Sequence, residues 1–130
     1  MEFRDNKAIY LQIADFVCEQ IMLGKWPIEQ KIPSVRELAM EMEVNPNTVM
    51  RTYELLQQKN VIQNKRGVGL FVTDDAIANI TAYQRAQFID EELPTVFRNI
   101  YLLNIDFDEL INRYNTFVKE NFNTRNHENQ

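Results

Sequence analysis

The chain has 130 residues, of which 45% are apolar and 25% are charged, so its composition is that of a globular protein with material for one ordinary core. Its formal net charge is −5, and no run of about 18 apolar residues occurs that would predict a membrane-spanning helix. The polar segment Met1 to Lys7 lacks the apolar run of a secretory signal. We therefore expect a cytoplasmic protein.

Cys18 is the only cysteine and His127 the only histidine. A lone cysteine forms no internal disulfide, and these two residues cannot supply the set of nitrogen and sulfur ligands that a zinc site needs. We therefore expect neither a metal nor another cofactor. Cys18 falls within a helical pattern and is predicted to be a small core residue, because no neighbour in the sequence would activate its thiol. His127 lies near the end of the chain and receives no role.

The first predicted helix runs from about Lys7 to about Leu23. Asp5 or Asn6 can cap its start, and Gly24 ends it before Trp26-Pro27. One apolar stripe, repeated every four residues, marks its buried face: Ile9, Ile13, Val17 and Ile21, with Phe16 beside them.

Two short helices follow, separated by a tight turn at residues 43–45. Ser34 and Glu37 have the spacing of a capping box, which predicts that the second helix starts at Ser34. Asn45 as cap and Pro46 as first residue predict a third helix that ends near Lys59. The inward positions are Leu38, Ala39 and Met42 in the second helix, and Val49, Thr52, Tyr53 and Leu56 in the third.

A β-hairpin and further helices complete the pattern. The extended runs 61–63 and 70–72 flank a loop with two glycines and two cations, which predicts the hairpin. A helix over 76–103 should kink or split near Leu93, because Pro94 cannot continue it. A last helix should start at Asp106, with Glu109 three residues on, and end near Phe122. Its apolar stripe is Phe107, Leu110, Ile111, Tyr114 and Val118, and residues 123–130 should fray.

Three helices followed by a hairpin, with a short turn between the second and third helix, is the element order of a winged helix-turn-helix. The expected fold class is thus mainly α with a small β-hairpin wing. We expect residues 1–75 to form the DNA-binding domain and residues 76–130 a helical dimerisation region. Between Lys31 and Arg66 there are six basic and four acidic residues, so this stretch is positive although the chain is acidic.

In that geometry the third helix enters the major groove N-terminus first. Short polar side chains at its start then reach base edges, and an arginine one turn later reaches a phosphate or a guanine. Cations at the wing tip meet phosphates or the minor groove, and a glycine there allows a tight turn. The DNA-binding residues that this geometry predicts are Arg36, Asn47, Thr48, Arg51, Lys65, Arg66 and Gly67.

Each of these features also has an interpretation without DNA. Asn45-Pro46 is a general way to start a helix, and Lys65-Arg66 fits a solvated hairpin tip. Gly67-Val68-Gly69 is a weak phosphate-binding signal, because no Walker-type Lys-Ser/Thr pair follows it. The acidic run at residues 90–92 fits a solvated helix face, and no nucleophile accompanies it.

Taken together, the motifs resemble the GntR family of bacterial regulators. The matching stretches run from Lys31-Ile32-Pro33-Ser34-Val35-Arg36-Glu37-Leu38-Ala39 through Val44-Asn45-Pro46-Asn47-Thr48-Val49 and Arg51-Thr52-Tyr53 to Gly67-Val68-Gly69-Leu70-Phe71-Val72. The resemblance begins near Ala8-Ile9-Tyr10-Leu11-Gln12-Ile13 and covers about half the chain. The short helical tail is similar to that of the YtrA-like subfamily, in which two helices form a dimerisation element.

This resemblance implies DNA contacts at Arg36, at residues 45–48, at Arg51 and at the wing around Gly67. It also implies a homodimer that binds a palindromic operator and represses a nearby operon, often one for a transporter. The chain departs from the family pattern at four places. Ile28-Glu29-Gln30 lacks the usual glycine, Ile32 replaces a leucine, Asn60 stands where a glycine often ends the recognition helix, and Leu70 replaces a threonine.

Two further interpretations stay open at this stage. A winged helix can bind another protein instead of DNA, and such a face should be apolar, whereas Asn47, Thr48 and Arg51 are polar. An unknown small-molecule effector could bind between two protomers beside Tyr83, Phe88, Phe97 and Tyr101, although these aromatic residues also suit a dimer core. No catalytic triad, metal set or cofactor motif occurs, so we do not expect an enzyme.

Overall fold

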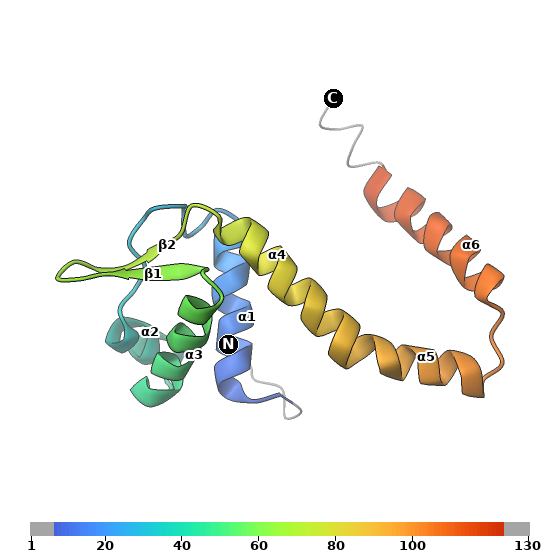
Figure 1. Cartoon of the computed structure of the whole chain (residues 1–130), viewed down its shortest axis with the longest axis horizontal. Helices are drawn as coiled ribbons and strands as arrows, with labels where there is room; N and C mark the ends of the chain where they lie inside the picture. The colour runs from blue at the N-terminus through green and yellow to red at the C-terminus, as the bar shows by residue number, and fades with distance from the viewer. Residues whose placement is uncertain (1–6, 124–130) are drawn as a thin grey trace. The chain divides into compact units, whose positions relative to one another are not determined.

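The computed structural model of the chain describes residues 7–123. The chain divides into two compact units, the first ending at Arg85 and the second starting at Ala86. The first unit contains α1 (Ile9–Met22), α2 (Val35–Met42), α3 (Pro46–Gln58), β1 (Ile62–Lys65), β2 (Gly69–Val72) and most of α4 (Ala76–Gln87) (Figure 1). The second contains the π-helical turn η1 (Phe88–Glu92), α5 (Leu93–Leu102), α6 (Phe107–Val118) and the π-helical turn η2 (Lys119–Asn123).

The helix starts of α2, α3 and α6 follow the predicted caps. Ser34 Oγ accepts the Glu37 N–H at 3.1 Å, and Glu37 Oε1 accepts the Ser34 N–H at 3.1 Å, which completes the capping box. Asn45 Oδ1 accepts the Asn47 N–H at 2.8 Å, and Asp106 caps α6 in the same way. The helix predicted from about Lys7 to about Leu23 is confirmed as α1, but its predicted cap was wrong, because the N-cap is Ala8 and no side chain caps the helix. Of the tail predicted to fray over 123–130, Asn123 ends the π-helical turn η2. Residues 124–130 with His127, and Asp5 and Asn6, lie outside the described residues.

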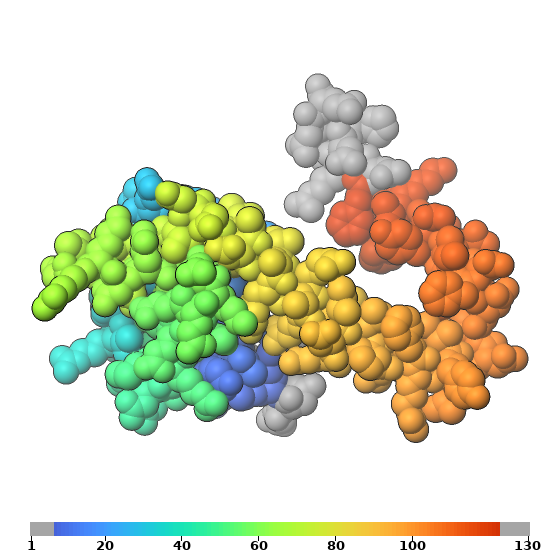
Figure 2. All heavy atoms as spheres, viewed as in Figure 1, coloured from blue at the N-terminus to red at the C-terminus, as the bar shows by residue number. Residues whose placement is uncertain are grey.

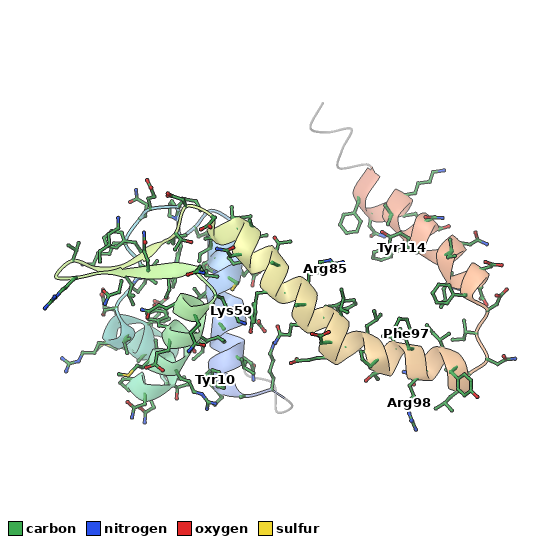
Figure 3. The ribbon with its side chains drawn as sticks, in the orientation of Figure 1. Tyr10, Lys59, Arg85, Phe97, Arg98 and Tyr114 are labelled. Carbon is green, nitrogen blue, oxygen red and sulfur yellow. The ribbon has the colours of Figure 1, made fainter. Side chains whose placement is uncertain are left out.

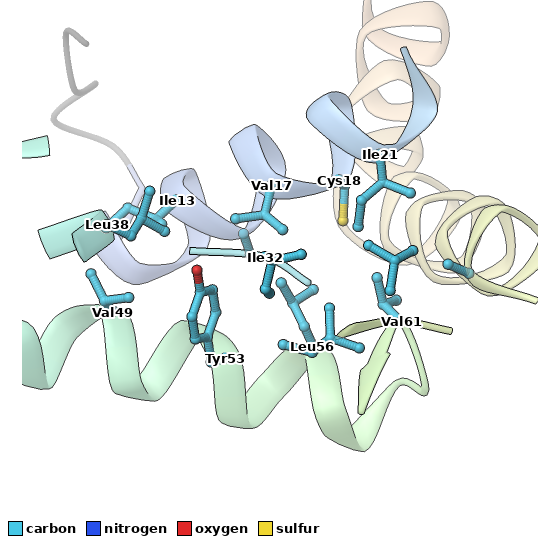
Figure 4. Packing of buried hydrophobic residues seen from close by; sticks show 14 of the residues in the cluster. Ile13, Val17, Cys18, Ile21, Ile32, Leu38, Val49, Tyr53, Leu56 and Val61 are labelled. Atoms are coloured by element: carbon cyan, nitrogen blue, oxygen red, sulfur yellow. The ribbon is translucent and has the colours of Figure 1, made fainter. Parts of the chain in front are cut away.

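One buried cluster holds α1, α2, α3, the hairpin and the start of α4 together (Figure 4). The stripe of α1 faces inward through Ile13, Val17 and Ile21, as predicted, and Ile9 stays exposed. Ala76 and Ile80 of α4 are fully buried, so the first unit extends to Arg85, whereas the sequence pattern placed a domain boundary after residue 75.

The wing contains more than the predicted hairpin. β1 and β2 pair antiparallel, with Ile62 opposite Val72 and Lys65 opposite Gly69. Residues 29–32 lie along the other edge of β2, where the Glu29 N–H donates to the Val72 carbonyl at 2.9 Å and the Ile32 N–H to the Leu70 carbonyl at 2.9 Å. Because a two-stranded hairpin alone is only marginally stable in water, this third segment supports the wing.

Within residues 7–123, four polar residues adopt the left-handed conformation that glycine favours. Glu29 has φ 65°, Glu43 in the turn between α2 and α3 has φ 57°, Asn60 after α3 has φ 58°, and Asn104 between α5 and α6 has φ 54°. Asn60 stands where the family pattern often has a glycine, and Glu29 lies in the region in which the pattern usually has another. Glu29 and Asn60 therefore adopt the left-handed backbone conformation that a glycine would adopt in these turns.

Tyr53 links α3 to the segment before α2. Its side chain is almost fully buried (Figure 4). Its hydroxyl donates a hydrogen bond to the Pro33 carbonyl at 2.8 Å. Burial raises the pKa of this phenol, so the hydroxyl stays protonated at neutral pH. We expect Tyr53→Phe to lower the free energy of unfolding by about 1 kcal/mol, because the carbonyl loses its donor. Urea unfolding measures this, and an unchanged midpoint with an unchanged slope would contradict it.

Cys18 lies fully buried in α1, as predicted for a small core residue. Burial, assisted by the nearby negative charge of Asp15, raises the pKa of its thiol to about 12. At pH 8 we expect a thiol reagent to modify the folded chain far more slowly than the chain in denaturant. Because the chain has one cysteine, absorbance of the released chromophore reports this site alone, and equal rates in both conditions would show that the thiol is accessible.

The helical pattern after residue 76 breaks where Pro94 predicts. The segment Phe88–Glu92 widens into a π-helical turn, and Pro94 lies in the first turn of α5. A proline lacks the amide hydrogen and clashes with the carbonyl four residues earlier, and a π-turn relieves such crowding. No residue of α5 or α6 is buried, and large apolar side chains on both helices are exposed. Between residues 7 and 123, no helix is both long and apolar enough to cross a membrane.

Candidate nucleic-acid interface

The first turns of α3 present the predicted polar side chains at the surface. Asn47 and Arg51 are exposed, and Thr48 is half-buried. Asn45 and Pro46 serve the helix itself, because the Asn45 side chain caps α3 and Pro46 occupies its first turn. Asn45 and Pro46 thus start the helix, whereas Asn47, Thr48 and Arg51 lie beside each other on its outer face.

Arg51 does not extend freely into solvent. Its guanidinium carbon lies 3.8 Å from the centre of the Tyr10 ring, which is the distance of a cation–π contact. The backbone of Tyr10 is held in turn by α3, because the buried hydroxyl of Thr52 donates to the Tyr10 carbonyl at 2.7 Å. The start of α1 and the start of α3 therefore form one surface.

A shallow depression of about 400 Å³ lies on this surface. Residues of both helices line it: Ala8, Ile9, Tyr10, Asn47, Thr48 and Arg51. The side of the depression formed by α3 carries hydrogen-bonding groups, and the side formed by α1 is apolar apart from the tyrosine hydroxyl. This combination suits contact with a sugar-phosphate backbone and with base edges.

Sequence reasoning missed Tyr10 on this surface, and it missed two exposed residues of α3, Met50 and Glu54, that line a second depression with Asn64 and Leu70 of the wing. Met50 and Glu54 are exposed on α3, and Tyr10 is half-buried at the start of α1. Met50 and Glu54 lie three and seven residues after Asn47, so extending the helical period outward from Asn47 would have identified them. Tyr10 has no such signal, because its contact with Arg51 joins residues 41 positions apart.

Arg36 lies exposed in the first turn of α2, one residue before the Glu37 of the capping box. Hydrogen bonds from the backbone N–H and the side chain of Ser34 lower the pKa of the Glu37 carboxyl. At neutral pH the Glu37 carboxyl is therefore ionised, and it accepts the Ser34 N–H in the capping box. The described structure assigns no hydrogen bond or ion pair to Arg36.

The wing carries its cations at different points. Lys65 ends β1 and its ammonium lies 4.4 Å from the centre of the Phe71 ring, whereas Arg66 is exposed in the turn. Gly67 has φ 79°, so this turn requires the left-handed conformation. The Lys31 side chain crosses Gly69, where an added Cβ would lie 2.8 Å from Lys31 Cε. Lys31 thus adds a third cation to the wing, and the hairpin tip protrudes from its unit (Figure 2).

Leu70, which replaces the threonine of the family pattern, is half-buried and packs against the core cluster.

The acidic charge of the chain is concentrated in the second unit. Residues 1–85 contain ten basic and eleven acidic residues, and residues 86–130 contain four and eight. The unit that carries α3 and the wing is therefore nearly neutral, which reduces the repulsion that a strongly acidic protein would meet at a phosphate backbone.

An exposed polar α3, a preceding helix joined by a tight turn, and a protruding basic hairpin define a winged helix-turn-helix of the DNA-binding kind. The sequence profile of the "Bacterial regulatory proteins, gntR family" matches residues 9–72. A solved structure of a GntR-family transcriptional regulator from Bacteroides thetaiotaomicron is 47% identical, with a TM-score of 0.77 over 87% of this chain and 98% of that one. The chain belongs to the GntR family and is a DNA-binding transcriptional regulator.

Two further similarities concern the subfamily and the ligand. The HTH-type transcriptional repressor YtrA of Bacillus subtilis is 29% identical over 107 residues, which are 82% of each chain, and places this protein among the YtrA-like regulators. The AraR DNA-binding domain, solved in complex with operator ORR3, is 27% identical with a TM-score of 0.50 over 56% of this chain and 86% of that one. The similarity to YtrA extends beyond the winged helix into the helical region.

Proposed function

We propose that this protein is a cytoplasmic homodimeric repressor that binds a palindromic operator near the genes it regulates. The observation that carries the proposal is the outer face of α3, where Asn47, Thr48 and Arg51 are gathered at the helix N-terminus. Asn47 and Thr48 have the length and hydrogen-bonding groups to reach base edges, and Arg51 can pair with guanine or a phosphate.

The remaining predicted residues position this helix on the duplex. Asn45 and Pro46 fix where α3 begins, so they act by orienting its first turn. We propose that Arg36 and the wing residues Lys65, Arg66 and Gly67 meet the phosphates on either side of the major groove. Phosphate contacts of this kind give affinity that falls as salt rises.

Dimerisation is proposed to use the helices of the second unit. Phe97 and Tyr101 of α5 are 50% and 84% exposed, and Phe107 and Tyr114 of α6 are 57% and 67% exposed. Figure 3 shows Phe97 and Tyr114 extending from their helices. Exposed aromatic surface of this extent is unusual on a monomer and suits burial against a second copy. A two-fold axis would then present two copies of α3 to half-sites about 34 Å apart, or a multiple of that.

Repression, rather than activation, is proposed from the similarity to YtrA, and a nearby transporter operon is the target that the family resemblance suggests. A small-molecule effector stays a prediction. Four aromatic residues could line its site, but we propose that they form part of the dimer interface instead: Tyr83, Phe88, Phe97 and Tyr101. We propose residues 1–75 as the DNA-binding domain and residues 76–130 as the dimerisation region, with the start of α4 completing the core of the first.

The test is a fluorescence anisotropy titration of the full chain on duplexes from its own promoter region, with scrambled duplex as competitor, at several salt concentrations. The expected result is binding that prefers one palindromic segment and weakens steeply with salt. No preference over scrambled DNA, at low salt and high protein concentration, would refute an unliganded operator-binding repressor. It would favour either a required ligand or a winged helix that binds a protein.

A further inference from the structure

The contact between Tyr10 and Arg51 brings together a residue of unassigned role and a proposed DNA-binding residue. The Arg51 guanidinium carbon lies 3.8 Å from the ring centre, which is close enough only if the guanidinium lies over the ring face. Tyr10 is located at the start of α1, next to the start of α3 (Figure 3). Arginine has a long, flexible side chain, so a surface that fixes its end reduces the entropy it loses on binding.

Tyr10 itself is held in place by α3. Thr52 is fully buried, and its hydroxyl lies 2.7 Å from the Tyr10 carbonyl and 3.2 Å from the Thr48 carbonyl. A hydroxyl has one hydrogen, and the shorter distance favours the bond to Tyr10. Thr52 directly follows Arg51, so the backbone that carries the ring and the backbone that carries the guanidinium are connected through one buried hydrogen bond.

The contact with Tyr10 leaves the N–H groups of the Arg51 guanidinium available for hydrogen bonds. A ring that covers one face of a guanidinium does not occupy its N–H groups, which lie in the guanidinium plane and point outward from it. Arg51 is exposed, and it lines the same depression as Asn47 and Thr48. Tyr10 therefore fixes the height and tilt of the guanidinium without competing for the acceptors of a base or a phosphate.

We propose that Tyr10 is a positioning residue for DNA recognition, which holds Arg51 in its DNA-binding orientation before the protein meets the operator. This inference rests on the proposed function, because it assumes that Arg51 contacts the operator. It assigns the role to the aromatic ring rather than to the hydroxyl. A phenylalanine at position 10 should therefore serve, whereas an aliphatic side chain of similar size should not.

The test is a double-mutant cycle on operator affinity, with the full chain and a fixed salt concentration. The variants are Tyr10→Phe, Tyr10→Leu, Tyr10→Met, Arg51→Ala, and each aliphatic Tyr10 variant combined with Arg51→Ala. Tyr10→Phe should bind within about twofold of the wild type, and Tyr10→Leu and Tyr10→Met roughly three- to fivefold more weakly. In the Arg51→Ala background the same Tyr10 substitutions should cause no further loss.

Circular dichroism melting identifies any variant that fails to fold, and the second aliphatic variant then completes the cycle. Losses from Tyr10 and Arg51 substitutions that simply multiply would overturn the inference, because they would show independent roles. Equal losses in the phenylalanine and the aliphatic variants would also overturn it, because they would assign the role to the hydroxyl. A wild-type chain without preference for the operator would refute the proposed function and this inference with it.

Discussion

Replacing Arg51 by alanine is expected to weaken operator binding by about 1–3 kcal/mol and to leave the fold intact. Arg51 is exposed on α3, so its removal creates no cavity, and its contact with the Tyr10 ring is at the surface. The loss should come from one arginine contact to a guanine edge or a phosphate. Anisotropy titration on the operator and on scrambled duplex measures both affinities.

Arg85→Ala is the matched control for this experiment. Arg85 is also exposed and lies in α4 (Figure 3). Its replacement by alanine removes the same charge as Arg51→Ala does. If the effect came from net charge alone, both variants would lose affinity for operator and scrambled DNA equally. A folded Arg51→Ala variant with unchanged operator affinity would remove Arg51 from the interface. A loss confined to the operator would identify Arg51 as a base-reading residue, and a uniform loss with a smaller salt slope would identify a phosphate contact.

Ile111→Glu is expected to convert the proposed dimer into monomers and to lower operator affinity by about 10²–10⁴-fold. Ile111 is 46% exposed on the apolar stripe of α6, and a buried, unpaired carboxylate there would oppose association. Two linked half-site contacts then become two separate ones, and the gain from effective concentration disappears. Sedimentation velocity at micromolar concentration measures the oligomeric state, and anisotropy measures binding.

Thr116→Glu on the polar side of α6 is the control, because Thr116 lies beside Asn112 and Glu109, away from the apolar stripe. It should leave both the sedimentation coefficient and operator affinity unchanged. An Ile111→Glu variant that stays dimeric would place the dimer interface elsewhere. A variant that is monomeric but binds the operator as tightly as the wild type would show that half-site linkage contributes little.

The sequence predicted the helices well because their ends carry local signals. Ser34 with Glu37, Asn45 with Pro46, and Asp106 each fix a helix start through side-chain to backbone bonds within three residues. Pro94 is also a local signal, because its missing amide hydrogen and its ring disturb the helix at a known position. Ala8 at the start of α1 carries no such signal, so the predicted cap there was wrong.

The candidate site was predictable along α3 and the wing, where helical period and turn residues are visible in the sequence, and at Arg36, because the capping box fixes the start of α2. The role of Tyr10 depends on packing between α1 and α3, and the pairing of residues 29–32 with β2 joins distant segments. The extent of the first unit into α4 likewise depends on the burial of Ala76 and Ile80. Long-range contacts of this kind leave no periodic pattern, which explains why the sequence did not reveal them.

The pairing of residues 29–32 with β2 affects how the chain folds. Its bond from the Ile32 N–H to the Leu70 carbonyl closes a loop of the chain that contains α2, α3 and β1. Forming that closure costs loop entropy before any packing compensates for it, so it belongs late on the folding pathway. Once this contact has formed, we expect the wing and the helix-turn-helix to open together. We expect amide hydrogens of Ile32 and of Leu56 to exchange with similar protection.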